Sequence, residues 1–200
     1  MTKGSVEIAR LFRVEDLLAG SNLGAEIYPG YPGAVVADGG LRQMTWGFPL
    51  TMKGKQGQPL KPRPVNNARS DKLDGFMWRY SFEERRCLIP LTAWAEAEGP
   101  KGSMTRTWLS LPNGEPFAAA GIWRSSPEWG DVYSMVMTDA CVHIGEIHDR
   151  MPVLLSPEDY GQWMSGSPAD ALDLCRPWSD AVQIERTAQS WSSRSRLPTA

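Results

Sequence analysis

The fold is decided by residues 93–138, which read AWAEAEGPKGSMTRTWLSLPNGEPFAAAGIWRSSPEWGDVYSMVMT. Alternating or apolar runs recur here between segments rich in glycine, proline and serine, a pattern typical of successive β-strands. We expect strands at 93–98, 105–111, 117–123 and 132–138. The segment Pro112-Asn113-Gly114 predicts a hairpin turn between the second and the third of them. Short strands joined by turns favour an antiparallel sheet.

The N-terminal part adds helix and more strand. Apolar residues at helical spacing predict one or two short helices up to Leu18, ended by Gly20. Residues 34–37 and 41–46 predict a strand pair around the turn Asp38-Gly39-Gly40.

Residues 51–90 are the basic part of the chain. Residues 51–66 lack apolar periodicity and predict a long loop; a short helix within 76–86 and a buried run at 87–90 are expected next. Residues 51–90 contain nine basic and four acidic residues, so this part has a net charge of +5 and the other 160 residues have a net charge of −7. Such a segment suits an anionic ligand, although a solvated surface loop explains the charge alone equally well.

The C-terminal part predicts peripheral helices. Ser156 and Ser167 each precede a proline and acidic residues, which favours helix N-termini. A last strand is expected at 182–184, and 188–200 reads as a loose tail. No repeat or linker divides the chain, so we expect one mainly antiparallel α+β domain over residues 1–200.

Composition limits the class of protein. The chain is 42% hydrophobic and 22% charged with a net charge of −2, which is ordinary for a globular protein. It has no apolar run of the roughly 18 residues that span a membrane, and no signal core, so the cytoplasm is expected. Cys87, Cys141 and Cys175 are widely spaced, which fits neither a disulfide framework nor a zinc site. We expect no metal and no cofactor.

One of the two histidines stands in Glu146-Ile147-His148-Asp149-Arg150-Met151-Pro152, just before the apolar residues 153–155. Histidine is the side chain that titrates closest to neutral pH, so His148 is a natural proton carrier at the rim of a core. The alternative is that His148 caps a turn, with its ring bonded to a backbone carbonyl.

Tryptophan is abundant, with nine in 200 residues, and Trp46 and Trp78 bracket the basic segment. Aromatic faces beside bases are a common way to hold single-stranded nucleic acid. Several of these tryptophans must also be core residues.

Five blocks occur in order along the chain: Trp46-Gly47-Phe48-Pro49; Asn67-Ala68-Arg69; Arg85-Arg86-Cys87-Leu88-Ile89-Pro90, followed six residues later by Glu96; Ala119-Ala120-Gly121-Ile122-Trp123; and Ile147-His148-Asp149-Arg150-Met151-Pro152-Val153. Together they resemble the SOS-response-associated peptidase (SRAP) family of abasic-site processing proteins, from about residue 34 to residue 164. The resemblance implies a compact α+β domain with a mainly antiparallel, barrel-like core and peripheral helices. It also implies single-stranded DNA, or a strand junction, containing an abasic site as the partner.

The family's reaction is a covalent crosslink between the abasic aldehyde and an N-terminal cysteine. Opening the sugar and forming an imine both need proton transfers, which a carboxylate and an imidazole can supply. By resemblance, Glu96 performs these steps, His148 assists proton transfer and release, and Asn67 orients the reacting group. The alternatives are a solvent-facing Glu96 in an alternating strand and a turn role for Asn67.

The same resemblance assigns DNA contacts to Arg69, Arg150, Trp46 and Thr138. The arginines suit phosphates, and Trp46 suits a stacking wall. Arg69 in a plain surface ion pair is the alternative.

One departure from the family concerns its nucleophile. The family typically begins Met-Cys, whereas this chain begins Met1-Thr2 and has no cysteine before Cys87. We favour an internal start with a Met-Cys leader upstream; the alternative is a variant that binds without crosslinking. Ala97 also stands where the family often has tryptophan, so one pocket wall is expected to be thinner.

Two classes of function therefore remain: an abasic-site crosslinker with lyase or autoproteolytic activity, and a single-stranded-DNA-binding module without chemistry. A general cysteine peptidase would need a Cys-His pair, and no spacing ties Cys87 or Cys141 to His148. Neither a membrane nor a protein partner is implied.

Overall fold

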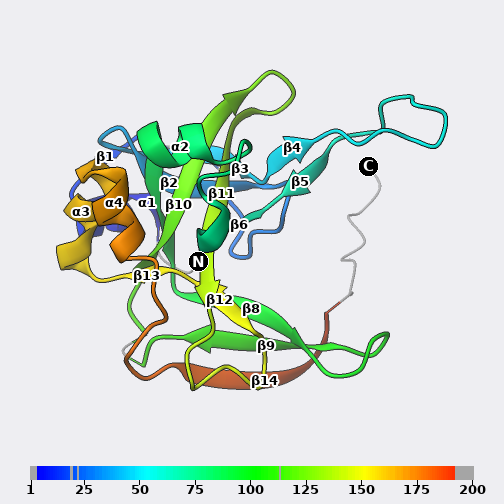
Figure 1. Cartoon of the computed structure of the whole chain (residues 1–200). Coiled ribbons are helices and arrows are strands. Elements are labelled where there is room, and N and C mark those ends of the chain that lie inside the picture. Colours follow the sequence, from blue (N-terminus) through cyan, green and yellow to red (C-terminus); the bar gives the residue numbers. More distant parts are fainter. Residues whose placement is uncertain (1–3, 19, 22, 113, 192–200) are drawn as a thin grey trace.

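Five strands close into a barrel. They are β2 (Pro32–Ala37), β3 (Gly40–Trp46), β7 (Arg86–Leu91), β10 (Phe117–Ser126) and β11 (Gly130–Asp139). Their order is β3-β2-β7-β10-β11, and β11 also pairs with β3, which joins the two ends of the sheet (Figure 1). The successive pairs are antiparallel and the closing pair is parallel. This computed structural model describes residues 4–18, 20–21, 23–112 and 114–191.

The β2–β3 hairpin confirms the strand pair predicted from the sequence. Ala37 pairs with Gly40 across a two-residue turn. Asp38 and Gly39 both have positive φ, 48° and 75°, as a type I′ turn requires. The Asp-Gly pair in this turn therefore matches the right-handed twist of the two strands.

The barrel interior is tightly packed. Alternate residues of the strands point inward, among them Val35, Met44 and Met135. Gly121 faces Cys87 across the β7–β10 pair, and a Cβ atom on Gly121 would lie 2.7 Å from the Cys87 sulfur. Glycine is required here because the interior has no room for a side chain.

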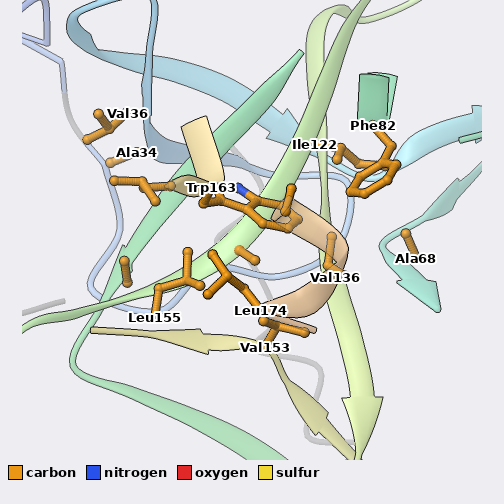
Figure 2. Close-up of a cluster of buried hydrophobic side chains, with 14 of the residues drawn as sticks. Ala34, Val36, Ala68, Phe82, Ile122, Val136, Val153, Leu155, Trp163 and Leu174 are labelled. Carbon is orange, nitrogen blue, oxygen red and sulfur yellow. The ribbon is translucent and has the colours of Figure 1, made fainter. Parts of the chain in front are cut away.

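The outer face of the barrel is covered by helices. They are α1 (Ser5–Phe12), α2 (Arg79–Glu84), α3 (Tyr160–Ser165) and α4 (Pro168–Asp173). Figure 2 shows Trp163 of α3 among the apolar side chains of the barrel wall. Trp163 is fully buried and its indole N–H donates to the carbonyl of Cys87 at 2.9 Å. The described helices therefore pack on the outside of the barrel wall and contribute no side chains to its interior core.

Two smaller sheets flank the barrel. One contains β8 (Ala93–Glu98), β9 (Thr105–Ser110) and β14 (Gln183–Ser190) in the order β14-β9-β8. The other is a two-stranded ribbon of β4 (Phe48–Leu50) and β5 (Arg63–Val65), which extends away from the barrel (Figure 1). The remaining elements are β1 (Glu15–Asp16), β6 (Asn67–Arg69), β12 (Arg150–Pro152), β13 (Leu154–Leu155) and the 3-10 turns η1 (Ser70–Lys72) and η2 (Pro157–Asp159).

Three expectations from the sequence are wrong, one of them only in part. The segment 51–66 is only in part the expected long loop, because residues 63–65 form β5 and Lys53 bridges to Pro59. The strands β9 and β10 do not form a hairpin, because they belong to different sheets; Asn113 of the expected turn lies outside the described residues. The first helix ends at Phe12 because Arg13 adopts the left-handed region with φ 55°, and β1 follows.

The C-terminal part follows the sequence more closely. The Ser167 hydroxyl accepts from the Asp170 backbone N–H in a capping box, as predicted, whereas Ser156 makes no such bond. The last strand is longer than expected and includes residues 188–190; residues 192–200 of the expected loose tail lie outside the described part. No helix in the described ranges is both long and apolar enough to cross a membrane. The α+β class with a mainly antiparallel barrel and peripheral helices is confirmed.

Candidate active site at the barrel mouth

A cavity of about 850 Å³ lies where the barrel meets the three-stranded sheet. Barrel residues such as Tyr133 and Met135 line it, together with Trp108 of β9 and residues 25–29. Three of the residues that the sequence singled out line this same cavity: Trp46, Asn67 and Glu96. The volume exceeds the need of one sugar and lies within the 300–1,000 Å³ or so of a drug-sized ligand site.

His148 joins the site through Glu96. The His148 Nε2 atom lies 4.0 Å from Glu96 Oε2. The Arg150 backbone N–H is 3.0 Å from His148 Nδ1, where it can donate a hydrogen bond. Because a backbone N–H only donates, this bond fits the neutral tautomer that keeps its proton on Nε2, facing Glu96. Nδ1 is also 3.0 Å from the Arg150 carbonyl oxygen, which only accepts and so pairs with the other tautomer. In either tautomer Nδ1 has the turn-capping role and Nε2 faces the carboxyl group.

The environment of Glu96 changes its acidity. Burial raises the pKa of Glu96 to about 7, with a smaller rise from the Asp149 carboxylate and an opposing effect of His148. The carboxyl side chain is 15% exposed, whereas the imidazole is 39% exposed. A carboxyl group that is half protonated at neutral pH can both accept and donate a proton. The pair therefore places a buried carboxyl group that lines the cavity beside a more exposed imidazole.

Trp46 and Asn67 are held side by side by β11. Trp46 pairs with Tyr133, and Asn67 pairs with Met135 two residues further along the same strand. The Trp46 ring stacks on Tyr133 with centroids 6.4 Å apart and planes 9° from parallel. Its indole N–H donates to the Asn66 carbonyl at 2.9 Å, so the ring is fixed as a wall of the cavity.

Arg69 and Arg150 lie on strands that flank the end of β11. Met137 pairs with both Arg69 of β6 and Pro152 of β12, so these strands occupy opposite edges of β11. Arg69 donates to Asp71 through two hydrogen bonds of 2.8 and 2.6 Å, the surface ion pair foreseen as its alternative role. The Arg69 guanidinium holds the pKa of the Asp71 carboxyl group below its ordinary value through these hydrogen bonds. Neither arginine belongs to the cavity lining, so their phosphate contacts stay a prediction.

Thr138 lies apart from the other predicted residues. It is buried, and its hydroxyl donates to the Cys175 carbonyl at 3.2 Å. Its neighbour Met137 lines the cavity, and adjacent strand residues point to opposite faces. The structure therefore does not bring the Thr138 side chain to the cavity.

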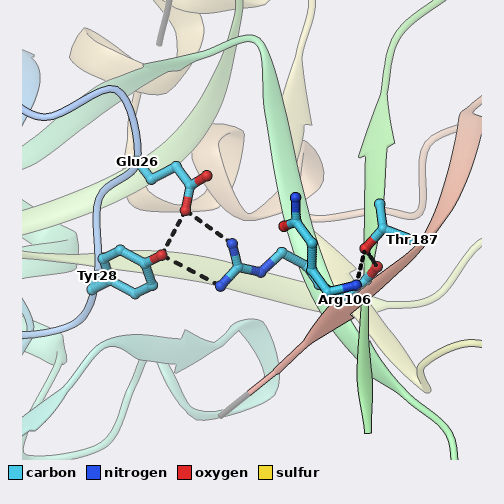
Figure 3. Close-up of polar contacts among 5 residues, drawn as sticks. Glu26, Tyr28, Arg106 and Thr187 are labelled. Atoms are coloured by element: carbon cyan, nitrogen blue, oxygen red, sulfur yellow. Dashed lines mark hydrogen bonds and ion pairs between the residues drawn. The ribbon is translucent and has the colours of Figure 1, made fainter. Parts of the chain in front are cut away.

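A second polar group in the cavity was missed by the sequence reasoning. Arg106 is buried; its guanidinium donates to Glu26 at 2.9 Å and to the Tyr28 hydroxyl at 3.3 Å (Figure 3). The Tyr28 hydroxyl donates to the same Glu26 carboxylate. The Arg106 guanidinium also lies 5.5 Å from the ring of Trp108. The sequence pattern that could have predicted this group is the two-residue spacing of Arg106 and Trp108, which puts both side chains on one face of β9.

The lining of the cavity is not basic. It contains the acids Glu26, Glu96 and Glu185, and Arg106 is the one lysine or arginine among its described lining residues. The described residues also contain no group of three His, Cys, Asp or Glu side chains placed to hold a metal ion. Proton transfer and stacking, and not strong positive charge, are what this lining offers a ligand.

The SOS response associated peptidase (SRAP) family model matches residues 5–190. The chain belongs to this family. Two curated relatives are each called "Abasic site processing protein YoqW", one from Bacillus subtilis (strain 168) and one from Bacillus phage SPbeta. Each is 29% identical over 129 residues, which is 60% of this chain and 57% of the relative. The match thus spans little more than half the length of these relatives.

Solved structures share the fold. A protein from Bacteroides thetaiotaomicron has a TM-score of 0.78 at 17% identity, with 93% of this chain and 89% of that chain covered. A protein from Bordetella bronchiseptica has a TM-score of 0.76 at 23% identity, with 92% and 96% covered. A phage-related protein from the same organism has a TM-score of 0.66 at 20% identity, with 94% and 92% covered. At these identities the likeness concerns the fold alone.

Proposed function

We propose that this chain binds an abasic site of single-stranded DNA at the cavity, and that Glu96 and His148 move protons during reaction of the lesion's aldehyde. The observation that carries the proposal is a carboxyl group with a pKa of about 7, lying 4.0 Å from an imidazole and lining a cavity with Asn67 and Trp46. Family membership and the printed name of the two relatives support the choice of an abasic site.

The chemistry makes two demands on the pair. An abasic sugar opens when its anomeric hydroxyl loses a proton, the bond from C1 to the ring oxygen breaks, and that oxygen gains a proton. An amine that adds to the resulting aldehyde gives a carbinolamine, which loses water to form an imine only when its hydroxyl is protonated. Glu96 can perform the donating and accepting steps in turn because both of its forms are populated near pH 7. The half-exposed His148 can return protons to solvent.

A covalent step needs a nucleophile besides this pair. By resemblance it is an N-terminal cysteine, whose amine forms the imine and whose thiol closes a thiazolidine. Cys87 and Cys141 are buried and therefore out of reach of a ligand, and burial raises the pKa of Cys175 to about 12, so its thiol stays protonated near neutral pH. None of them lines the cavity, which also disfavours a general cysteine peptidase.

The test compares one labelled oligonucleotide in three forms: with an abasic site, with a tetrahydrofuran analogue that cannot open, and with an intact base. We expect the 200-residue chain to prefer the abasic form but to give no adduct that resists heat and detergent. A version with a Met-Cys leader placed ahead of Met1 is expected to give one, more slowly when Glu96→Gln is also introduced. Equal affinity for the abasic and intact strands would refute the proposal.

A second candidate is a binding module without chemistry. It is favoured by the absence of any lysine or cysteine among the described residues that line the cavity. The same experiment decides between the two: a module keeps its preference for the abasic strand and forms no adduct even with the leader.

A further inference from the structure

The ribbon, residues 48–65, is an ordered arm. β4 and β5 pair through Phe48↔Val65, Pro49↔Pro64 and Leu50↔Arg63. Beyond them the Leu60 N–H donates to the Met52 carbonyl at 2.8 Å, and the Gly54 N–H donates to the Gln58 carbonyl at 2.7 Å. The hairpin is therefore hydrogen-bonded up to its tip, and it projects away from the barrel (Figure 1).

The base of the ribbon is the wall of the cavity. Trp46 comes two residues before β4 and Asn66 directly follows β5, both line the cavity, and they are hydrogen-bonded to each other. Phe48 is fully buried, packs against Trp78 and lies under the guanidinium of Arg124 at 4.4 Å. This anchor fixes the direction in which the arm leaves the site.

The ribbon carries one sign of charge. Its side chains include four exposed bases and no acid: Lys53, Lys55, Lys61 and Arg63. No carboxylate of the described residues forms an ion pair with any of them. The cavity lining and the Arg69–Asp71 pair are acidic or neutral by contrast. The ribbon thus carries four exposed bases beyond the cavity wall, in addition to Arg150 beside His148.

We infer that the ribbon binds the phosphate backbone of the DNA that leaves the cavity, beyond the nucleotides held inside it. This inference rests on the proposed function. At about 3.3 Å per residue, the tip around Gly54 lies about 13 Å beyond Leu50, which corresponds to about four nucleotides of one strand. The half-exposed Leu50, Met52 and Leu60 lie among the basic side chains of the ribbon. They can pack on the sugars of the DNA while the lysines contact its phosphates.

The experiment varies both the arm and the length of the DNA. Abasic strands with no flank, with a single-stranded flank and with a duplex flank are titrated against the wild type and the triple variant K53Q/K55Q/K61Q. We expect roughly tenfold weaker binding of both flanked strands by the variant, and the same binding of the unflanked strand. The slope of log affinity against log salt should fall by about 2 with the single-stranded flank and by about 3 with the duplex flank.

The matched control is the triple variant R10Q/K101Q/R176Q, which removes the same charge from exposed positions outside the ribbon. It should bind all three strands like the wild type, with only a small general loss. If the two triple variants weaken flanked binding equally, the ribbon has no specific role and the inference is refuted, while the abasic preference of the unflanked strand still stands. If no protein prefers the abasic strand, the proposed function itself is refuted. Thermal melting of each variant checks that the barrel is intact.

Discussion

Glu96→Gln is expected to stabilise the protein, and increasingly so as the pH rises. The pKa of Glu96 is raised from 4.5 to about 7 by burial, so folding favours the protonated carboxyl group. The native state therefore keeps a proton that the unfolded chain loses between these two values, and the wild type loses stability over that pH window. At 1.36 kcal/mol per pKa unit, the loss amounts to about 3 kcal/mol above pH 7. Glutamine has the shape of the protonated acid and does not ionise.

Urea unfolding of the wild type and of Glu96→Gln, measured at intervals from pH 4 to pH 8, gives the two stabilities to compare. They should agree near pH 4 and diverge to about 3 kcal/mol at pH 8. Glu98→Gln is the control on the same strand. Hydrogen bonds from Thr107 and Arg186 lower the pKa of Glu98, so its substitution should destabilise the protein near neutral pH, with the opposite sign. A pH-independent difference between the wild type and Glu96→Gln would refute the view that Glu96 is protonated near neutrality.

Three further substitutions test other parts of the site. His148→Gln removes a group that lowers the pKa of Glu96, so NMR titration of that carboxyl group should give a higher pKa than in the wild type; an unchanged pKa would show that the two groups do not interact. Trp46→Ala should weaken abasic-strand binding by about 1–3 kcal/mol in a fluorescence titration, and Trp46→Phe by much less, because stacking needs only an aromatic face. Arg106→Met should lower the free energy of unfolding by about 1 kcal/mol, because Glu26 loses its charged donor and keeps only the Tyr28 hydroxyl, and adding Glu26→Gln should recover part of it; strict additivity of the two substitutions would show that the two side chains do not interact.

Local patterns predicted those elements that local forces determine. The Asp38-Gly39 turn requires positive φ at both positions, so the β2–β3 hairpin could be predicted from a few residues. Barrel closure could not, because the pairing of Tyr133 with Trp46 joins residues 87 positions apart and no turn signal records it. The same limit explains why the predicted hairpin between β9 and β10 is wrong. Strands that follow each other in sequence usually pair, but both edges of β9 are already paired, one with β8 and the other with β14.

The residues of the candidate site also divide into those that the sequence could predict and those that only the folded structure reveals. Glu96, Asn67 and Trp46 were assigned by resemblance to a family, and the structure brings all three to one cavity. Arg106 and Glu26 are 80 residues apart and belong to no shared motif, so only the folded chain reveals their contact. Thr138 shows the converse limit, since a motif position does not tell which face of a strand a side chain occupies.

The raised pKa of Glu96 requires that the lysines of the ribbon lie outside the cavity. A cation within about 4–6 Å of a carboxyl group lowers its pKa by 1–3 units, so lysines inside the cavity would ionise Glu96 and remove its capacity to donate a proton at neutral pH. DNA nevertheless needs positive charge to be held. Three of the described lysines, Lys53, Lys55 and Lys61, stand on the ribbon, where solvent and salt screen a charge that lies more than about 8 Å from Glu96. A lysine placed within about 4–6 Å of Glu96 in the cavity, with one ribbon lysine removed, should therefore leave the net charge unchanged yet lower the pKa of Glu96 and slow proton transfer at neutral pH.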